Sequence, residues 1–204
     1  LATGDHKAVN KMHEMSFLIY NLVIFPMMAG ILIVNDDFVQ FFLGQDFQDA
    51  RYAIAIMIFR MFFIGWTNIM GIQILIPHNR NKEFMISTTA PAIISVGLNL
   101  LFLPKLGYIG AAIVSVLTEA LVWAIQLYFT RRYLKEVPII GSMTKIVLAS
   151  AIMYGILLGS KTVIHFSPTL NVLVFAVLGG IIYLFAILSL KVVDVKELKQ
   201  IIKK

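Results

Sequence analysis

Six long stretches of almost uncharged residues fill this chain, and they constrain its fold more than any motif does. They comprise residues 15–35, 52–76, 84–103, 109–130, 144–160 and 169–190. A helix needs about 20 consecutive apolar residues to cross the hydrocarbon layer of a bilayer, and each stretch is close to that length. We therefore predict an all-α integral membrane bundle of six transmembrane helices.

The composition indicates that lipid is the solvent for most of the chain. Of the 204 residues, 59% are hydrophobic and 14% are charged, whereas charged residues make up about a quarter of a soluble domain. In hydrocarbon every backbone N–H and C=O must be bonded within the protein, so the stretches are expected to be helical. The alternation of apolar and polar residues typical of a membrane barrel strand is absent from the sequence.

The basic residues are distributed unevenly between the connecting segments. With a cytoplasmic N-terminus, the inner segments hold 13 of the 17 Lys and Arg residues, and the outer segments hold Arg51, Lys105 and Lys161. Cytoplasmic segments of membrane proteins are enriched in Lys and Arg. We therefore expect a multi-pass protein of the cell membrane with both termini in the cytoplasm. Because the basic residues form no single patch, we expect no nucleic-acid partner.

Two segments outside the six stretches are predicted to lie along the membrane surface. Residues 36–47 are rich in Phe and mix apolar with polar side chains, which predicts a short interfacial helix. In residues 191–204, Val195, Leu198 and Ile201 recur at helical intervals among lysines. This pattern predicts an amphipathic cytoplasmic tail on the inner leaflet.

Glu119 lies at the centre of the fourth stretch. An ionised carboxylate at that depth costs at least about 2.5 kcal/mol, so Glu119 must face protein or water. At helical spacing Ser115 and Gln126 share its side of the helix, and Thr118 borders it. Two interpretations stay open: Glu119 handles protons or substrate, or it is protonated and bonds a neighbouring helix.

Arg60 lies eight residues into the second stretch, which places it about 12 Å deep in a helix. Thr67 follows on the same face, with Asn68 beside it. The planar guanidinium matches the geometry of phosphate oxygens, so Arg60 is a candidate to bind an anionic head group. The alternative is that its long side chain extends to the outer head groups.

The third stretch carries Thr88, Ser95 and Asn99 on one side, so three of the six stretches have polar faces. A simple anchor has no need of such faces, whereas a bundle around a hydrated cavity does. The candidate substrate-binding or cavity-lining residues are Arg60, Thr67, Asn68, Ser95, Asn99, Ser115, Glu119 and Gln126.

Catalytic constellations are missing from the sequence. The four histidines, His6, His13, His78 and His165, fall in different flanks and loops, and no Gly-rich nucleotide loop is present. The chain also has no cysteine, which excludes a disulfide or an iron–sulfur site. We therefore predict no catalytic residue, no metal and no cofactor, and a protein that is not an enzyme.

Four motifs follow one another along the chain. They are Phe25-Pro26-Met27, Gly44-Gln45-Asp46-Phe47 with Ala50 after it, the segment from Asn99 to Pro104, and Leu106-Gly107-Tyr108-Ile109-Gly110-Ala111-Ala112 followed by Glu119. Their order and spacing resemble the polysaccharide-transport branch of the MOP superfamily, which includes bacterial O-antigen and capsule repeat-unit flippases. Glu119 matches an acidic position often seen in this family, whereas Arg60 matches no motif.

The resemblance implies that the chain is the C-terminal part of a two-lobed transporter whose N-terminal lobe is absent from this sequence, which opens at Leu1 without a Met. In the family, alternating access between the lobes turns a polyprenyl-pyrophosphate-linked oligosaccharide from the cytoplasmic to the outer leaflet. The implied partners are this lipid-linked oligosaccharide, membrane lipid and the N-terminal lobe, with a polysaccharide polymerase as a further candidate.

Three other functions stay open at this point. A drug exporter of the related MATE branch, driven by sodium or protons, would carry an aromatic and acidic cavity in the absent lobe. An integral membrane acyl- or glycosyltransferase would need a histidine or paired acids at the membrane face, and the dispersed histidines argue against it. A scaffold with the same fold would transport nothing.

Overall fold

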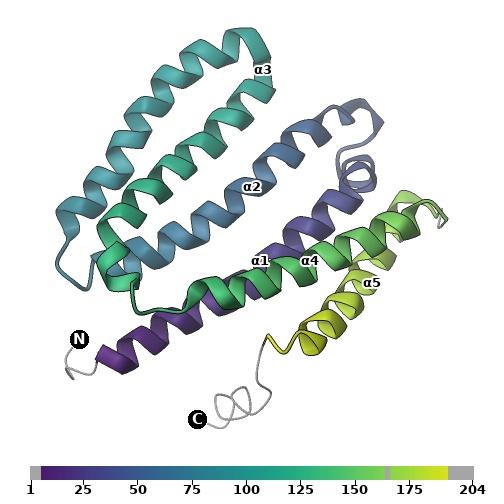
Figure 1. Ribbon diagram of the computed structural model, residues 1–204. Helices are drawn as coiled ribbons and strands as arrows, with labels where there is room; N and C mark the ends of the chain where they lie inside the picture. The colour runs from purple at the N-terminus through teal and green to yellow at the C-terminus, as the bar shows by residue number, and fades with distance from the viewer. Residues whose placement is uncertain (1–5, 164–165, 193–204) are drawn as a thin grey trace. The chain divides into compact units, whose positions relative to one another are not determined.

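The computed structural model describes residues 6–163 and 166–192, and every long element in it is a helix (Figure 1). The elements are α1 (His6–Phe42), the 3₁₀ turn η1 (Gln45–Phe47), α2 (Ala50–Asn68), the π-helical segment η2 (Ile69–Leu75), α3 (Asn81–Leu134), α4 (Ile139–Lys161) and α5 (Pro168–Ser189). The all-α class predicted from the sequence is confirmed for the described residues.

The described part of the chain has five helices long and apolar enough to cross a membrane, so the predicted number of six is wrong. The third and fourth apolar stretches do not form separate helices with a loop between them. Both fall within α3, which has 54 residues. A straight helix of that length would extend about 80 Å, far more than the roughly 30 Å of a bilayer core.

Helix α3 resolves this mismatch by folding back on itself at Gly107. Gly107 has φ 55° and ψ −138°, a backbone conformation that glycine tolerates and other residues adopt only with strain. The side chains of Gln126 and Ser87 are hydrogen-bonded at 3.2 Å, although 39 positions along a straight helix would separate them by about 58 Å. Figure 1 shows the two arms of α3 side by side. The third and fourth apolar stretches are therefore the two arms of α3, which meet at this sharp bend.

The predicted interfacial helix over residues 36–47 is also wrong in its bounds. Helix α1 continues through Pro26 to Phe42, and the rest of the predicted segment contains only the short turn η1. The chain leaves the helix at Gly44, whose φ of 88° is not helical. The predicted amphipathic tail falls almost entirely on residues 193–204, which lie outside the described residues.

The chain divides into two compact units, and the division runs through α1. The first unit contains residues 6–20 and 49–139 of the described chain, and the second contains residues 21–48 and 140–192. The first unit therefore combines the beginning of α1 with α2, η2 and both arms of α3. The second unit combines the rest of α1 with α4 and α5.

Aromatic side chains form the core of the first unit. The ring of Phe17 on α1 lies 4.7 Å from that of Trp66 on α2, and Trp66 lies 6.3 Å from Trp123 on the second arm of α3. Tyr20 packs against Gly65 and donates its hydroxyl to the Met61 carbonyl. These contacts hold α1 and the second arm of α3 against α2.

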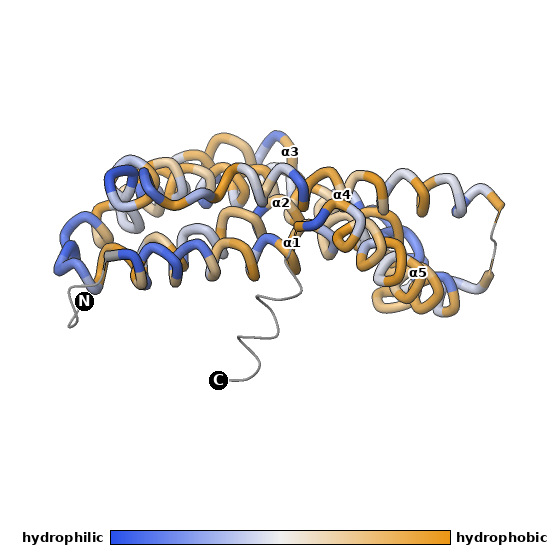
Figure 2. The backbone as a smooth tube through the Cα atoms, turned by 60° about the horizontal axis from the view of Figure 1, so that its bottom comes forward, coloured by the Kyte–Doolittle hydropathy of each residue, from blue (hydrophilic) through white to orange (hydrophobic). Residues whose placement is uncertain are grey.

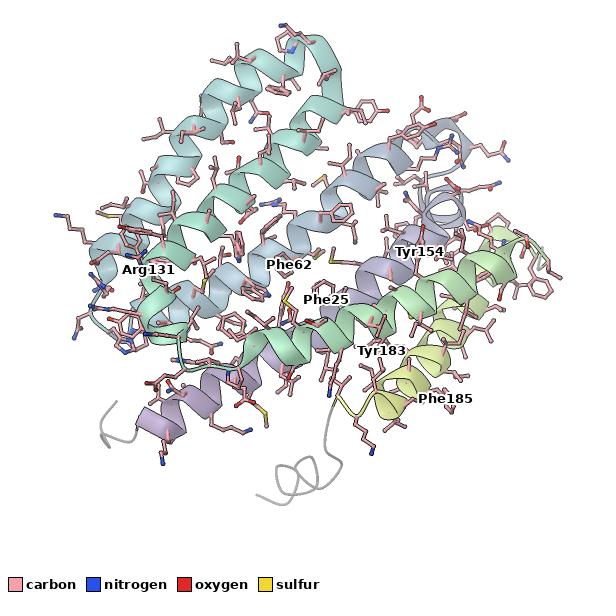
Figure 3. The ribbon with its side chains drawn as sticks, in the orientation of Figure 1. Phe25, Phe62, Arg131, Tyr154, Tyr183 and Phe185 are labelled. Carbon is pink, nitrogen blue, oxygen red and sulfur yellow. The ribbon has the colours of Figure 1, made fainter. Side chains whose placement is uncertain are left out.

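In the second unit, polar bonds join the helices at their ends. Lys161, the last residue of α4, pairs with Asp37 of α1 at 3.3 Å, and Asn171 of α5 donates to Asp37 at 2.9 Å. At the other end of α5, the Tyr183 hydroxyl donates to the Leu22 carbonyl at 2.8 Å. Figure 3 shows Tyr183 turned toward the neighbouring helices and Phe185 turned away from them.

Large apolar side chains cover much of the outer surface. Leu100 is 73% exposed and Phe185 is 74% exposed, and many other large hydrophobic side chains are exposed as well. Figure 2 shows the helices coloured mainly as hydrophobic, with hydrophilic segments near the beginning of α1 and at several other places along the chain. A soluble monomer rarely exposes so much contiguous apolar surface, whereas lipid chains would cover it.

Candidate functional site

The two charges predicted to lie inside the membrane form an ion pair in the first unit. The Arg60 Nη2 atom lies 2.9 Å from Glu119 Oε1, and Arg60 Nε donates to the same oxygen at 3.3 Å. Arg60 belongs to α2 and Glu119 to the second arm of α3. The sequence predicted each charge separately, and the fold brings them together.

Pairing answers the energetic problem that each charge poses alone. A single charged side chain at the centre of a membrane helix costs about 2.5–3.5 kcal/mol on insertion scales, whereas a pair carries no net charge. The side chain of Arg60 is 38% exposed and that of Glu119 is 19% exposed. Part of the guanidinium thus stays accessible, so the pair can still meet a ligand.

The ion pair borders a cavity of about 440 Å³ in the first unit. Three helical segments and the adjoining η2 segment line it. The lining residues are Arg60, Ile64, Thr67, Asn68, Ile72, Phe84, Thr88, Ala92, Thr118, Glu119, Val122 and Gln126. Polar and apolar side chains therefore alternate around a space that is large enough for a small ligand.

Most of the hydroxyl groups that line the cavity are bonded within their own helix. Thr67 donates to the Ile64 carbonyl at 2.9 Å, and Thr118 donates to the Val114 carbonyl at 2.7 Å. The Asn68 amide donates to the same Ile64 carbonyl at 2.9 Å. These bonds use the donors and leave the hydroxyl and amide oxygens able to accept hydrogen bonds.

Gln126 joins the two arms of α3 at the edge of the cavity. Its side chain is 1% exposed, and its amide nitrogen donates to Ser87 Oγ at 3.2 Å. Its amide oxygen has no hydrogen-bond partner among residues 6–163 and 166–192. A buried acceptor without a partner is costly, so a water molecule or a ligand hydroxyl is expected there.

Five of the eight predicted site residues line this cavity, and three lie elsewhere. Arg60, Thr67, Asn68, Glu119 and Gln126 are among its lining residues. Asn99 donates to the backbone carbonyl of Ser95 at 2.9 Å, one turn away on the same helix. Ser115, half-buried on the second arm of α3, does not line the cavity. The structure gives these positions, and the role of each residue stays a prediction.

Sequence reasoning left several lining residues out of the candidate list. Thr88 and Thr118 had been noted beside the polar faces, but Ile64, Phe84 and Val122 gave no signal because apolar side chains are ordinary in a membrane helix. The π-helical η2 was also not predicted. Such segments are rare and often lie near functional sites, and η2 contributes Ile72 to the cavity.

Within the described ranges, no group of three His, Asp or Glu side chains is placed to hold a metal ion. What the cavity offers is one ion pair, amide groups and hydroxyl acceptors. These groups suit the binding of a polar or anionic ligand.

Comparison with known proteins places the chain among membrane proteins. An uncharacterized membrane protein of Methanocaldococcus jannaschii, MJ1068, is 25% identical over 201 residues, which cover 98% of this chain and 39% of that protein. A protein of Escherichia coli strain K12 named "Putative O-antigen transporter" is 33% identical over 89 residues, or 44% of this chain and 21% of that protein. The chain thus covers less than half the length of either relative. No protein-family profile matches the chain, and no solved structure gives a significant match.

These similarities are distant and partial, and they leave the family of the chain open. Together with five helices of membrane-spanning length, they identify a multi-pass membrane protein distantly similar to a protein named as a transporter.

Proposed function

We propose that this chain is part of a flippase that moves a polyprenyl-pyrophosphate-linked oligosaccharide from the cytoplasmic to the outer leaflet for surface polysaccharide assembly. The polar cavity around the Arg60–Glu119 ion pair is the observation that carries the proposal. Ionisable residues inside membrane segments mark substrate pathways more often than structural sites. The partial similarity to the Escherichia coli protein adds support.

The proposed role of the ion pair follows from its chemistry. A guanidinium presents a planar fork of donors that fits phosphate oxygens, and charge-assisted bonds of this kind are strong. Glu119 would hold Arg60 in place until the anionic pyrophosphate competes for it. Gln126 and Asn68 supply amide groups that can bond sugar hydroxyls. The transport cycle needs no covalent chemistry from these residues, so the proposed function is not enzymatic.

The size of the cavity limits what this chain contributes. A volume of about 440 Å³ falls in the range of roughly 300–1,000 Å³ that holds a drug-sized molecule. The cavity would therefore take the head-group region of the substrate, and an N-terminal lobe of the full protein would enclose the rest. The proposed orientation places both termini in the cytoplasm, on the strength of the basic residues in the inner segments.

Gene deletion in the source organism, followed by restoration with the full protein, tests this proposal. Deletion is expected to lower surface polysaccharide and to raise lipid-linked oligosaccharide in the inner leaflet. Wild-type protein should restore both, whereas Arg60→Gln and Glu119→Gln at matched abundance should not. Arg51→Gln is the matched control, because Arg51 lies on the same helix but outside the cavity.

Two results would oppose the proposal. Unchanged surface polysaccharide after deletion, with new sensitivity to cationic drugs, would indicate an exporter. Full restoration by both cavity variants would show that the ion pair has no part in transport.

A further inference from the structure

A second, smaller cavity lies where α1 begins and α3 ends. Its volume is about 320 Å³, and it is lined by Val9, Asn10 and His13 of α1, by His78, and by Arg132, Tyr133 and Glu136. Six of these seven side chains are polar. The cavity belongs to the first unit, and it shares no lining residue with the cavity around Arg60.

The lining residues all lie just outside apolar stretches of the sequence. Residues 9–13 precede the stretch that begins at residue 15, His78 follows the stretch that ends at residue 76, and residues 132–136 follow the one that ends at residue 130. Segments in this position lie at the level of the lipid head groups, where Tyr and Arg are enriched. The cavity is therefore at head-group depth.

His13 is the buried polar group that an occupant of this cavity could bond. Its side chain is 2% exposed, and neither ring nitrogen has a hydrogen-bond partner among the residues that the structure describes. The backbone of Gln73 lies near the ring but outside hydrogen-bonding geometry. A buried polar side chain without a partner costs about 1–3 kcal/mol, so an occupant that bonds His13 would stabilise the site.

Two opposite charges on the cavity wall are kept apart from each other. Arg132 and Glu136 are four residues apart, but the Arg132 Nη2 atom donates to the Tyr133 hydroxyl at 2.7 Å. The Glu136 carboxylate instead accepts from the Asn10 amide at 3.0 Å. A guanidinium and a carboxylate both retain bonding capacity after one such contact. The wall thus offers a positive group and a negative group to a ligand that carries both charges.

The aromatic ring of Tyr133 fixes the positive side of the cavity. The Arg132 guanidinium lies 4.8 Å from the centre of that ring, and the His78 ring lies 4.1 Å from it. His78 Nδ1 contacts the Ile74 carbonyl at 2.7 Å, which orients the imidazole and leaves its other nitrogen for a ligand. Arg80 does not line the cavity, but it interacts with the Tyr133 side chain as well as pairing with Glu83 at 2.6 Å, so it adds positive charge on the same side.

We propose that this cavity binds the phosphoethanolamine head group of a membrane phospholipid. The phosphate would contact Arg132, with His13 as a further donor, and the primary ammonium would contact Glu136. Basic pockets between membrane helices bind lipid head groups, and the carboxylate in this one selects a head group that also carries a hydrogen-bonding cation. The assignment does not depend on the proposed flippase function.

Lipid retention by the full protein, purified in detergent, tests the site. Native mass spectrometry would follow binding of phosphatidylethanolamine, phosphatidylcholine and phosphatidylglycerol, each added separately. We expect one phosphatidylethanolamine molecule to bind at least about tenfold more tightly than the other two, a difference equivalent to about 1.4 kcal/mol. Free phosphoethanolamine forms a second arm, and competition by it would show that the head group alone is recognised.

Matched variants on the same segment separate the site from general lipid contact. Arg132→Gln should weaken phosphatidylethanolamine binding about tenfold, and Glu136→Gln should remove the preference over phosphatidylglycerol. Arg131→Gln and Lys135→Gln are the controls, because neither residue lines the cavity and Arg131 instead stacks on Tyr128 at 4.5 Å. Glu136 is exposed and lies beyond the end of α3, so its variant is expected to fold.

Two outcomes would overturn the proposal. Equal retention of the three lipids by the wild-type protein would mean that the cavity holds water only. Equal losses in the control variants and the cavity variants would assign the binding to general surface charge.

Discussion

Each of the two units has an ion pair that joins two helices, but the pairs lie at different depths. In the first unit, Arg60 is eight residues into an apolar stretch and its partner Glu119 is near the centre of another. In the second unit, Asp37 lies near the end of α1 and Lys161 is the last residue of α4. A charge at a helix end can be hydrated, whereas a charge deep in a span needs protein or water inside the bilayer.

The cavities of the two units differ in the same way. The second unit has a cavity of about 500 Å³ lined mainly by apolar side chains such as Met27, Val34 and Phe175. The first unit has the cavity of about 440 Å³ that contains the deep ion pair. The helices of both units are similarly hydrophobic, but one unit encloses a polar cavity and the other an apolar cavity. We accordingly propose that the first unit handles substrate and that the polar bonds of the second hold its helices together.

Neutralising one member of the deep pair is expected to have the largest effect. Breaking a buried ion pair costs about 3–5 kcal/mol, but exposure of Arg60 and solvent screening reduce the expected loss here to about 1–3 kcal/mol. Arg60→Gln and Glu119→Gln should each lower the unfolding temperature of the purified full protein. The double variant should be more stable than either single one, because it leaves no unpaired charge. Equal, additive losses would show that the two residues do not interact.

Gly110 offers the next largest effect, because it lies at the return bend of α3. A Cβ atom there would approach the Phe102 carbonyl oxygen to 2.6 Å, so the backbone must shift. Gly110→Ala should destabilise the protein by about 1–3 kcal/mol, as overpacked sites do. Gly97 of the same helix and Gly180 of the second unit have no atom within 4 Å of such a Cβ and serve as controls. Thermal unfolding that shows equal losses at the three positions would argue against the tight bend.

The Asp37–Lys161 pair should contribute less than the deep pair. The two side chains are 13% and 30% exposed, and Lys161 also donates to the Ile33 carbonyl at 2.7 Å. Asp37→Asn should lower stability by about 0.5–1.5 kcal/mol and leave the transport rate per molecule unchanged. A loss of transport at normal abundance would mean that the second unit also handles substrate.

Ser115→Ala is expected to have the smallest effect. Ser115 was predicted as a site residue, but it is half-buried outside the cavity. Stability should change by no more than about 0.5 kcal/mol, and transport should stay at the wild-type level. Thr67→Val, inside the cavity, is the companion variant. A larger transport defect at Ser115 than at Thr67 would show that the site extends beyond this cavity.

Hydropathy was sufficient to predict helices of membrane length, because each span must be apolar over about 20 residues. It counted the third and fourth stretches as separate helices, whereas both fall within α3, which bends at Gly107 in the gap between them. It failed again at residues 36–42, where α1 continues because residues 36–43 contain no Gly or Pro. Periodicity describes one helix at a time and does not report how a chain reverses.

The candidate site shows the same limit. The depth of Glu119 indicated that it must face protein or water, and the depth of Arg60 left head-group binding or extension to the outer head groups open. Their pairing required the packing of α2 against the second arm of α3, which no pattern within either segment encodes. Apolar lining residues such as Phe84 and Val122 could not be predicted from the sequence either, because they do not differ from the other residues of a membrane helix. In a chain that is hydrophobic throughout, only polar residues stand out.

Exchanging the deep charges is the most direct test of the role of the ion pair. The full protein would carry Arg60→Glu together with Glu119→Arg, beside the double Gln variant as a reference of known abundance. Transport of lipid-linked oligosaccharide would be measured in vesicles at matched protein amounts. We predict that the exchange restores abundance above that of the single variants but leaves transport absent, because the cation no longer occupies its place on α2. Transport at the wild-type rate would contradict a substrate-binding role and make the pair a purely structural contact.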